Sequence, residues 1–343
     1  MPSRQNRPRL VDPIDRQQRE LTDQHILPHL DEIMSELADL RVALDRTVGE
    51  EARRRGLAIS ETLAQTDGKR GGRFMGEALS QAMLLGWSDF RLRLTVYPYG
   101  CCLEITYALF EVIRNNPGMF EQSAVDRLRV FREEGGVFKR IWGSIRGVYF
   151  QNAMQLGSHY LDLANDTVDL AKPSIDQAPM ETSGFKNFET FGDYATVRAL
   201  YVGDQIYRNN FIPDLLPYCP LVTVNHDKRV IRVDNMWEPI SRTILWGNVA
   251  AFADIAAPVV RSIIAPSSIA QLGAPFVNFA HAGGLQFRSV EDAEWQVMLG
   301  EFTQLTVAER FQELKRVTKI AQLVNIIWSR AKMYDRVVDD LGP

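Results

Sequence analysis

Apolar residues recur at helical spacing near the N-terminus. The stripe consists of Leu30, Ile33, Met34, Leu37, Leu40 and Leu44. Pro28 precedes the stripe, where its missing N–H costs a starting helix nothing. We therefore predict a helical N-terminal arm over residues 1–66. Its stripe packs either on the body of the protein or on a second copy of the chain, which would form a homo-oligomer.

Helix and strand patterns are mixed between residues 67 and 170. A break rich in glycine and charge at 66–73 opens this region, and Leu92, Leu94 and Val96 then alternate as in a strand. The predicted elements are a helix over 74–85, a strand over 90–97, helices over 101–114 and 122–134, and paired strands within 144–166. We place the turn of those paired strands at Gly157–Ser158.

The remaining residues, 171–343, predict a mostly helical C-terminal region with one β-hairpin. We expect a loop over 173–184, a helix over 193–208 and the hairpin over 221–234. Thr306 and Glu309 have the spacing of a capping box at the start of a long helix. The chain as a whole is predicted to be α+β, with a small α/β unit at 67–170 between the arm and the C-terminal region.

Composition and charge narrow the class of protein. The net charge is -4, whereas a general nucleic-acid binder would carry a basic face. The three cysteines, Cys101, Cys102 and Cys219, fit neither a disulfide framework nor a zinc pattern, which favours a reducing compartment. We find no signal-peptide pattern and no apolar run long enough to span a membrane. We expect a cytoplasmic protein that binds neither nucleic acid nor membrane.

The stretch 96–114 is the best candidate for chemistry. It has the pattern of a strand, a sharp turn, a glycine, a cysteine and a helix. A thiol at a helix N-terminus lies at the positive end of the helix dipole, which favours the nucleophilic thiolate. A free cysteine is also one of the most commonly buried residues, so Cys102 has a purely structural interpretation as well.

The sequence Tyr-Pro-Tyr-Gly-Cys-Cys at 97–102, followed by a helix with Thr106 and Leu109, resembles the nucleophile segment of bacterial transglutaminase-like proteins. These form a branch of the papain-like cysteine superfamily, and the resemblance covers about residues 75–166. It implies that Cys102 is the nucleophile of an acyl transfer or hydrolysis on a peptide-like amide, without a cofactor. It also implies a histidine on a following strand and an aspartate on the next, for which Asp162 is the match.

The histidine position departs from this family. If the turn holds three residues, Asn152 lies opposite Asp162 and occupies the place of the base. An amide does not accept a proton at neutral pH, so the base would be missing. His159 is close in sequence, but three residues from Asp162 it faces the other side of the strand. His226, in the later hairpin, is a second candidate for the base.

Three functions therefore stay open. The first is a cysteine-type acyl transferase or amidase, active or catalytically lapsed. The second is a non-catalytic protein that binds a peptide or partner protein on the same fold. The third is a metal-dependent sugar transferase whose carboxylates hold a divalent cation. For the third, the candidates are Asp162, Asn165, Asp166 and Asp169.

Overall fold

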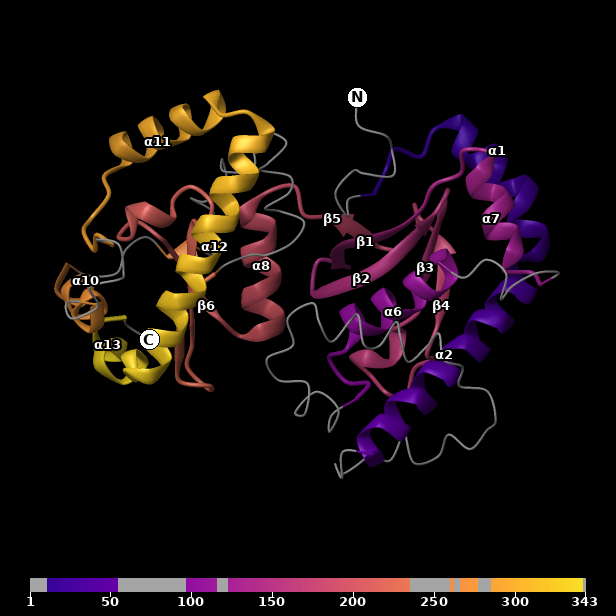
Figure 1. Cartoon of the computed structure of the whole chain (residues 1–343), viewed down its shortest axis with the longest axis horizontal. Coiled ribbons are helices and arrows are strands. Elements are labelled where there is room, and N and C mark those ends of the chain that lie inside the picture. The colour runs from indigo at the N-terminus through magenta and orange to yellow at the C-terminus, as the bar shows by residue number, and fades with distance from the viewer. Residues whose placement is uncertain are drawn as a thin grey trace. The chain divides into compact units, whose positions relative to one another are not determined.

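The computed structural model describes residues 11–54, 97–115, 123–234, 260–261, 266–276 and 285–341. The chain divides into two compact units (Figure 1), unit 1 being Met1–Arg146 with Gln151–Asn187 and unit 2 being Gly147–Phe150 with Phe188–Pro343. The division after Asn187 is later than the boundary predicted at 170. The predicted boundary at 66, the helix over 74–85 and most of the strand over 90–97 lie outside the described residues. The architecture is α+β, as the sequence predicts.

Unit 1 is an antiparallel sheet with helices on one face. Its described helices are α1 (Arg16–His25), α2 (Leu30–Arg54), α6 (Cys102–Asn115) and α7 (Asp126–Glu133), with short 3-10 turns at Leu27–His29 and Asn165–Thr167. Its strands are β1 (Phe138–Ile145), β2 (Tyr149–Leu156), β3 (His159–Asp162), β4 (Asp176–Pro179) and β5 (Phe185–Asn187), in the order β4-β3-β2-β1-β5. The pairs β1–β5, β2–β3 and β3–β4 are antiparallel. The short link from β1 to β2 leaves no room for a parallel crossover.

The two faces of this sheet have separate cores. On one face, Met154, Leu156 and Leu161 are buried with the apolar sides of α2 and α6. On the other face, Ala153 and Tyr160 belong to a smaller cluster, against which Val11 and Ile14 pack. Successive strand residues point to opposite faces, so these two clusters fix the direction of every side chain on β2 and β3.

The N-terminal helices are an integral part of unit 1. Asp15 caps α1 by accepting a hydrogen bond from the backbone N–H of Gln18 at 2.9 Å. The stripe residues Ile33 and Leu37 on α2 are 0% exposed and belong to the core that α6 shares. The stripe therefore packs on the body of its own chain, which was the first of its two interpretations, and a homo-oligomer through the N-terminal helices stays a prediction.

Unit 2 combines a second sheet with helices. Its described helices are α8 (Phe191–Val202), α10 (Pro266–Gly273), α11 (Asp292–Gln304), α12 (Val307–Arg330) and α13 (Met333–Leu341), with 3-10 turns at Pro213–Leu215 and Ala274–Phe276. Its strands are β6 (Gln205–Arg208), β7 (Leu221–Asn225), β8 (Val230–Val233) and β9 (Val260–Arg261), in the order β8-β7-β6-β9. The predicted hairpin is β7–β8 and forms half of this sheet. The capping box of Thr306 and Glu309 is present at the start of α12.

Two predictions of local structure are wrong, and one strand was not predicted. The helix predicted over 193–208 ends at Val202, because Gly203 takes a left-handed conformation at φ 74°, and β6 follows. Strand β4 lies within the predicted loop over 173–184. Strand β1 was not predicted, because it carries Lys139 among its apolar residues. The Lys139 ammonium lies 3.0 Å from the carboxylate of Asp12 inside unit 1.

Candidate functional site at Cys102 and Asn152

Cys102 is the first residue of α6, at the end of a turn that is tied to the rest of unit 1. Gly100 adopts φ +69°, a conformation that suits a residue without a side chain. Its N–H donates to the carbonyl of Thr167 at 2.8 Å, and the N–H of Cys101 donates to the carbonyl of Pro98 at 3.0 Å. The turn therefore fixes the thiol at the helix N-terminus, beside the loop that follows β3.

The side chain that meets the thiol is Asn152, from the middle of β2. Asn152 Nδ2 donates to Cys102 Sγ at 3.3 Å, and Thr106 Oγ1 donates to the carbonyl of Asn152 at 3.1 Å. Cys102 and Thr106 are one helical turn apart, so they lie on the same side of α6. Strand β2 is thus held against the first turn of α6 at two points. The sequence reasoning missed Thr106 in this role.

The surroundings of Cys102 do not activate it. Burial raises the pKa of the Cys102 thiol, and the negative charges of Glu104 and Asp162 raise it further. The hydrogen bonds from Asn152 act in the opposite direction without reversing the shift. Since the thiolate is the nucleophilic form, the resting group at neutral pH is the neutral thiol.

Asp162 belongs to the opposite face of the sheet. Its Oδ2 accepts hydrogen bonds from Gln151 Nε2 and, at 3.2 Å, from Tyr160 Oη, while the N–H of Ala164 donates to its Oδ1 at 2.8 Å. Burial raises its pKa to about 7, although the hydrogen bonds from Ala164 and Tyr160 lower it. Asp162 makes no hydrogen bond to Asn152 or Cys102, so it does not orient a group at the thiol.

The turn explains why Asp162 lies there. Leu156 pairs with His159 and Met154 with Leu161, so Gly157 and Ser158 alone form the turn. The pairing of Asn152 with Asp162, which requires three turn residues, is therefore wrong. Continued along the strands, the observed register brings Leu163 to the position opposite Asn152, and Leu163 is buried in the core on that face.

His159 lies at the far end of the β2–β3 hairpin. Its partner Leu156 is four residues from Asn152 along β2, a distance of about 13 Å at about 3.3 Å per residue. The adjacent Ser158 N–H donates to Thr22 Oγ1 on α1 at 3.0 Å. Burial lowers the pKa of His159, and its Nδ1 has no hydrogen-bond partner among the described residues. The structure therefore does not bring His159 to the thiol.

His226 has a different neighbour. Its Nδ1 lies 2.7 Å from the hydroxyl oxygen of Tyr334 on α13, within unit 2. The candidate base and the thiol of Cys102 therefore belong to different units.

The acidic residues predicted as metal ligands are separated or already paired. Asp166 accepts hydrogen bonds from both Arg41 Nη1 and Nη2 at 3.0 Å, and the Arg41 side chain is 1% exposed. Asp169 accepts from the N–H of Ala171 at 3.1 Å within its own loop. Within the ranges that the structure describes, no three acidic, histidine or cysteine side chains are grouped to hold a metal ion.

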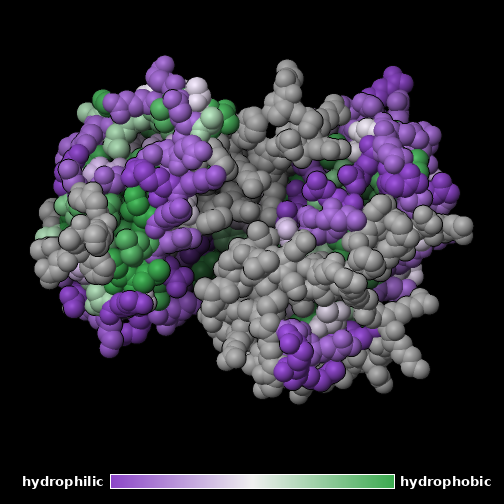
Figure 2. All heavy atoms as spheres, viewed as in Figure 1, coloured by the Kyte–Doolittle hydropathy of each residue, from purple (hydrophilic) through white to green (hydrophobic). Residues whose placement is uncertain are grey.

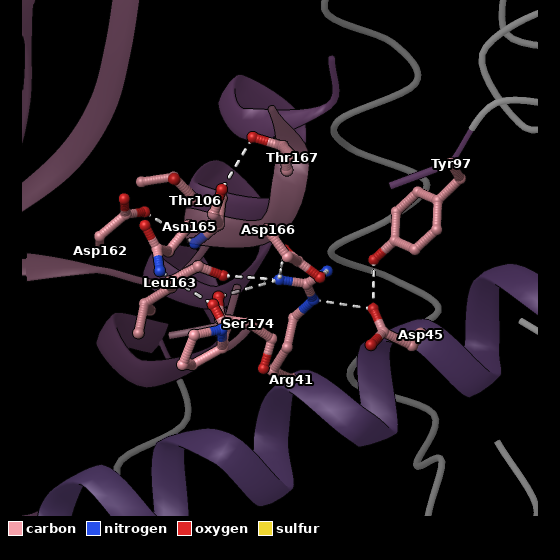
Figure 3. Close-up of polar contacts among 12 residues, drawn as sticks. Arg41, Asp45, Tyr97, Thr106, Asp162, Leu163, Asn165, Asp166, Thr167 and Ser174 are labelled. Carbon is pink, nitrogen blue, oxygen red and sulfur yellow. Dashed lines mark hydrogen bonds and ion pairs between the residues drawn. The ribbon is translucent and has the colours of Figure 1, made fainter. Parts of the chain in front are cut away.

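Arg41 joins α2 to the loop after β3 (Figure 3). Besides Asp166, it donates to the carbonyls of Leu163 at 3.0 Å and Ser174 at 3.3 Å, and its Nε donates to Asp45 at 2.8 Å. Tyr97 Oη also donates to Asp45, which links this network to the turn before Cys102. The sequence does contain a signal for Arg41, because it lies one turn after Leu37 on the apolar stripe, where a charge requires buried partners.

Comparisons of the chain with protein-family models, with curated proteins and with solved structures found no match. Among the described residues, no helix has both the length and the apolar character needed to cross a membrane.

Proposed function

We propose that this chain is a binding protein built on a unit that resembles transglutaminase-like proteins, in which the thiol chemistry has lapsed. The site at the start of α6 would hold an amide-containing segment of a peptide or partner protein. The observation that carries the proposal is that the Asn152 amide lies 3.3 Å from Cys102 Sγ, where a catalytic base would have to stand.

The loss of chemistry follows from what an amide can do. A catalytic thiol needs a neighbouring base to take its proton, and an amide does not accept one at neutral pH. The raised pKa of Cys102 acts in the same direction. Asp162, the expected orienter, is engaged with Gln151 and Tyr160 on the other face of the sheet.

The capacity to bind follows from what the site still offers. Asn152 is 7% exposed and its Oδ1 accepts no hydrogen bond from the described residues, so a peptide N–H that reached this atom would find an acceptor. Two large apolar side chains close to Cys102 in sequence are exposed, Tyr99 by 55% and Leu103 by 39%. A polar pair, with exposed aromatic and aliphatic groups close to it along the chain, suits recognition of a peptide backbone together with its side chains.

The first test is the pH dependence of Cys102 alkylation by iodoacetamide, with Cys101→Ser and Cys219→Ser in the background. We expect an apparent pKa at or above the ordinary value of about 8.5. Asn152→His should then lower the apparent pKa, because an imidazole replaces the amide beside the thiol. If the parent protein, with Asn152 in place, shows an apparent pKa well below the ordinary value, the proposal of a lapsed site is wrong and acyl transfer is favoured.

The second test addresses binding with blocked hydrophobic tripeptide amides as probes. We expect a saturating probe to slow the alkylation of Cys102, and Leu103→Ser to weaken this protection. Leu200→Ser is the matched control, because Leu200 is also an exposed helical leucine but lies in unit 2. Peptide binding at this site would be contradicted if no probe slowed the alkylation of Cys102. It would also be contradicted if the two substitutions weakened the protection equally.

A further inference from the structure

Unit 2 contains a cavity of about 370 Å³ between the end of α11, the start of α12 and the turn around Pro217. Its floor is apolar and includes Leu216, Phe302 and Leu305. Figure 2 shows hydrophobic residues at the turn between α11 and α12, while hydrophilic residues predominate along the visible side of α12. The volume lies within the range of about 300–1,000 Å³ that is usual for small-molecule sites.

Tyr218 is one of the residues that line this cavity, and its hydroxyl is buried without a partner in the part of the chain that the structure describes. The residue is 3% exposed, and its ring packs edge-on against Phe302 with centroids 5.3 Å apart. Its Oη finds no hydrogen-bond partner among the described residues. A buried hydroxyl without a hydrogen bond is costly and uncommon, so its presence in the lining of a cavity points to a ligand that completes it.

The charged residues that line the cavity are all acidic, while Arg310 and Arg316 lie near enough to Tyr218 to act on its hydroxyl. The acidic residues are Glu301, Glu309 and Glu313. Glu309 caps α12 through Thr306, which lowers its pKa and keeps it ionised, and Glu313 pairs with Arg316. Glu301 has no ion pair among the described residues, so its charge is available to a cation. The nearby Arg310 donates to the carbonyls of Phe302 and Thr303.

We propose that this cavity binds an alkylammonium group, either of a free amine or of a lysine side chain. The carbon chain would lie on the apolar floor formed by Leu216, Phe302 and Leu305. The ammonium would donate hydrogen bonds to Tyr218 Oη and to the carboxylate of Glu301. This site is in a different unit from Cys102, so its test does not depend on whether the proposed peptide site is correct.

The experiment titrates the full chain with n-hexylamine by calorimetry, with n-hexanol and hexanoate as matched neutral and anionic probes. We expect saturable binding of hexylamine and much weaker binding of the other two. Tyr218→Phe and Glu301→Gln should each weaken hexylamine binding about tenfold, the size expected for one hydrogen bond to a charged group. Glu291→Gln, the same change of charge at the other end of α11, should leave binding unchanged.

The fold of each variant is checked by its melting temperature without ligand. Tyr218→Phe should melt at the same temperature as the parent or higher, because it removes an unpartnered hydroxyl. Equal binding of hexanol and hexylamine would overturn the proposal, as would unchanged affinity in Tyr218→Phe. If lysine methyl ester competes with hexylamine, the source of the group is a lysine side chain; if it does not compete, a free amine is the ligand.

Discussion

The buried carboxyl of Asp162 makes the stability of unit 1 depend on pH. Its pKa is about 7 in the folded protein, against 3.8 for the ordinary group, because burial disfavours its charged form. The folded state therefore binds one more proton than the unfolded state across this interval, and stability falls as pH rises from about 4 to about 7. The contribution of the protonated Asp162 to stability is complete below pH 3.8 and is lost above the pKa of this group in the folded protein.

The size of this loss of stability follows from the difference between the two pKa values of Asp162. The difference is about three pH units, and each unit is worth about 1.4 kcal/mol, so the loss amounts to about 4 kcal/mol. Asp162→Asn does not titrate and keeps groups that can bond to Gln151, Tyr160 and the N–H of Ala164. The variant should be as stable as the parent near pH 4 and more stable by about that amount at pH 8.

Hydrogen exchange of peptides from β2 and β3 is the appropriate assay, because it reports on unit 1 alone within the two-unit chain. Parent and variant are compared at the same pH, at several values between pH 4 and pH 8, so intrinsic exchange rates and all other titrating groups cancel. The ratio of their protection should change by almost three orders of magnitude across the range. A ratio that stays constant with pH would refute the reasoning.

Two further substitutions, each with a control, test how α2 is held to the rest of unit 1. Arg41→Leu leaves the carboxylate of Asp166 and the carbonyls of Leu163 and Ser174 without their donor, so we expect a loss of about 3–5 kcal/mol in urea unfolding. The exposed Arg129→Leu should cost less than about 1 kcal/mol, and equal losses would show that the Arg41 network is not stabilising. Leu37→Ala, at a position that is 0% exposed, should cost about 2–5 kcal/mol in the same assay, whereas exposed Leu200→Ala should have little effect. A small effect of Leu37→Ala would contradict the burial of the stripe in its own core.

The elements that the sequence predicts well are those whose pattern is local. The stripe on α2, the helix that begins at Cys102, the β7–β8 hairpin and the cap at Thr306 each depend on neighbouring residues of the same segment. The sequence does not show where such a segment packs. Whether the stripe on α2 meets its own chain or another one depends on contacts with α6, which lies far away in the sequence.

The elements that the sequence predicts poorly depend on contacts with residues far away in the chain. The sequence of strand β1 does not alternate regularly between apolar and polar residues. Its Lys139 can be buried because it pairs with Asp12, which lies far away in the chain. Strand β4 has the sequence Asp-Gln-Ala-Pro and forms by pairing with β3, so its own sequence is typical of a loop. The unpartnered hydroxyl of Tyr218 is likewise a property of the folded chain, since a tyrosine beside a proline is unremarkable in sequence.

The candidate site depends on the number of residues in one turn. With three residues between the strands, Asn152 and Asp162 would face each other and share the side of the sheet that meets α6. With the two that are present, every residue of β3 moves by one position relative to β2. A shift of one residue exchanges the faces of a strand, so Leu163 joins the core beside α6 and Asp162 turns to Tyr160 and Gln151. The amide at 152 thus gives the thiol of Cys102 a neighbour that accepts no proton, and the parity of this turn separately places Asp162 on the other face of the sheet.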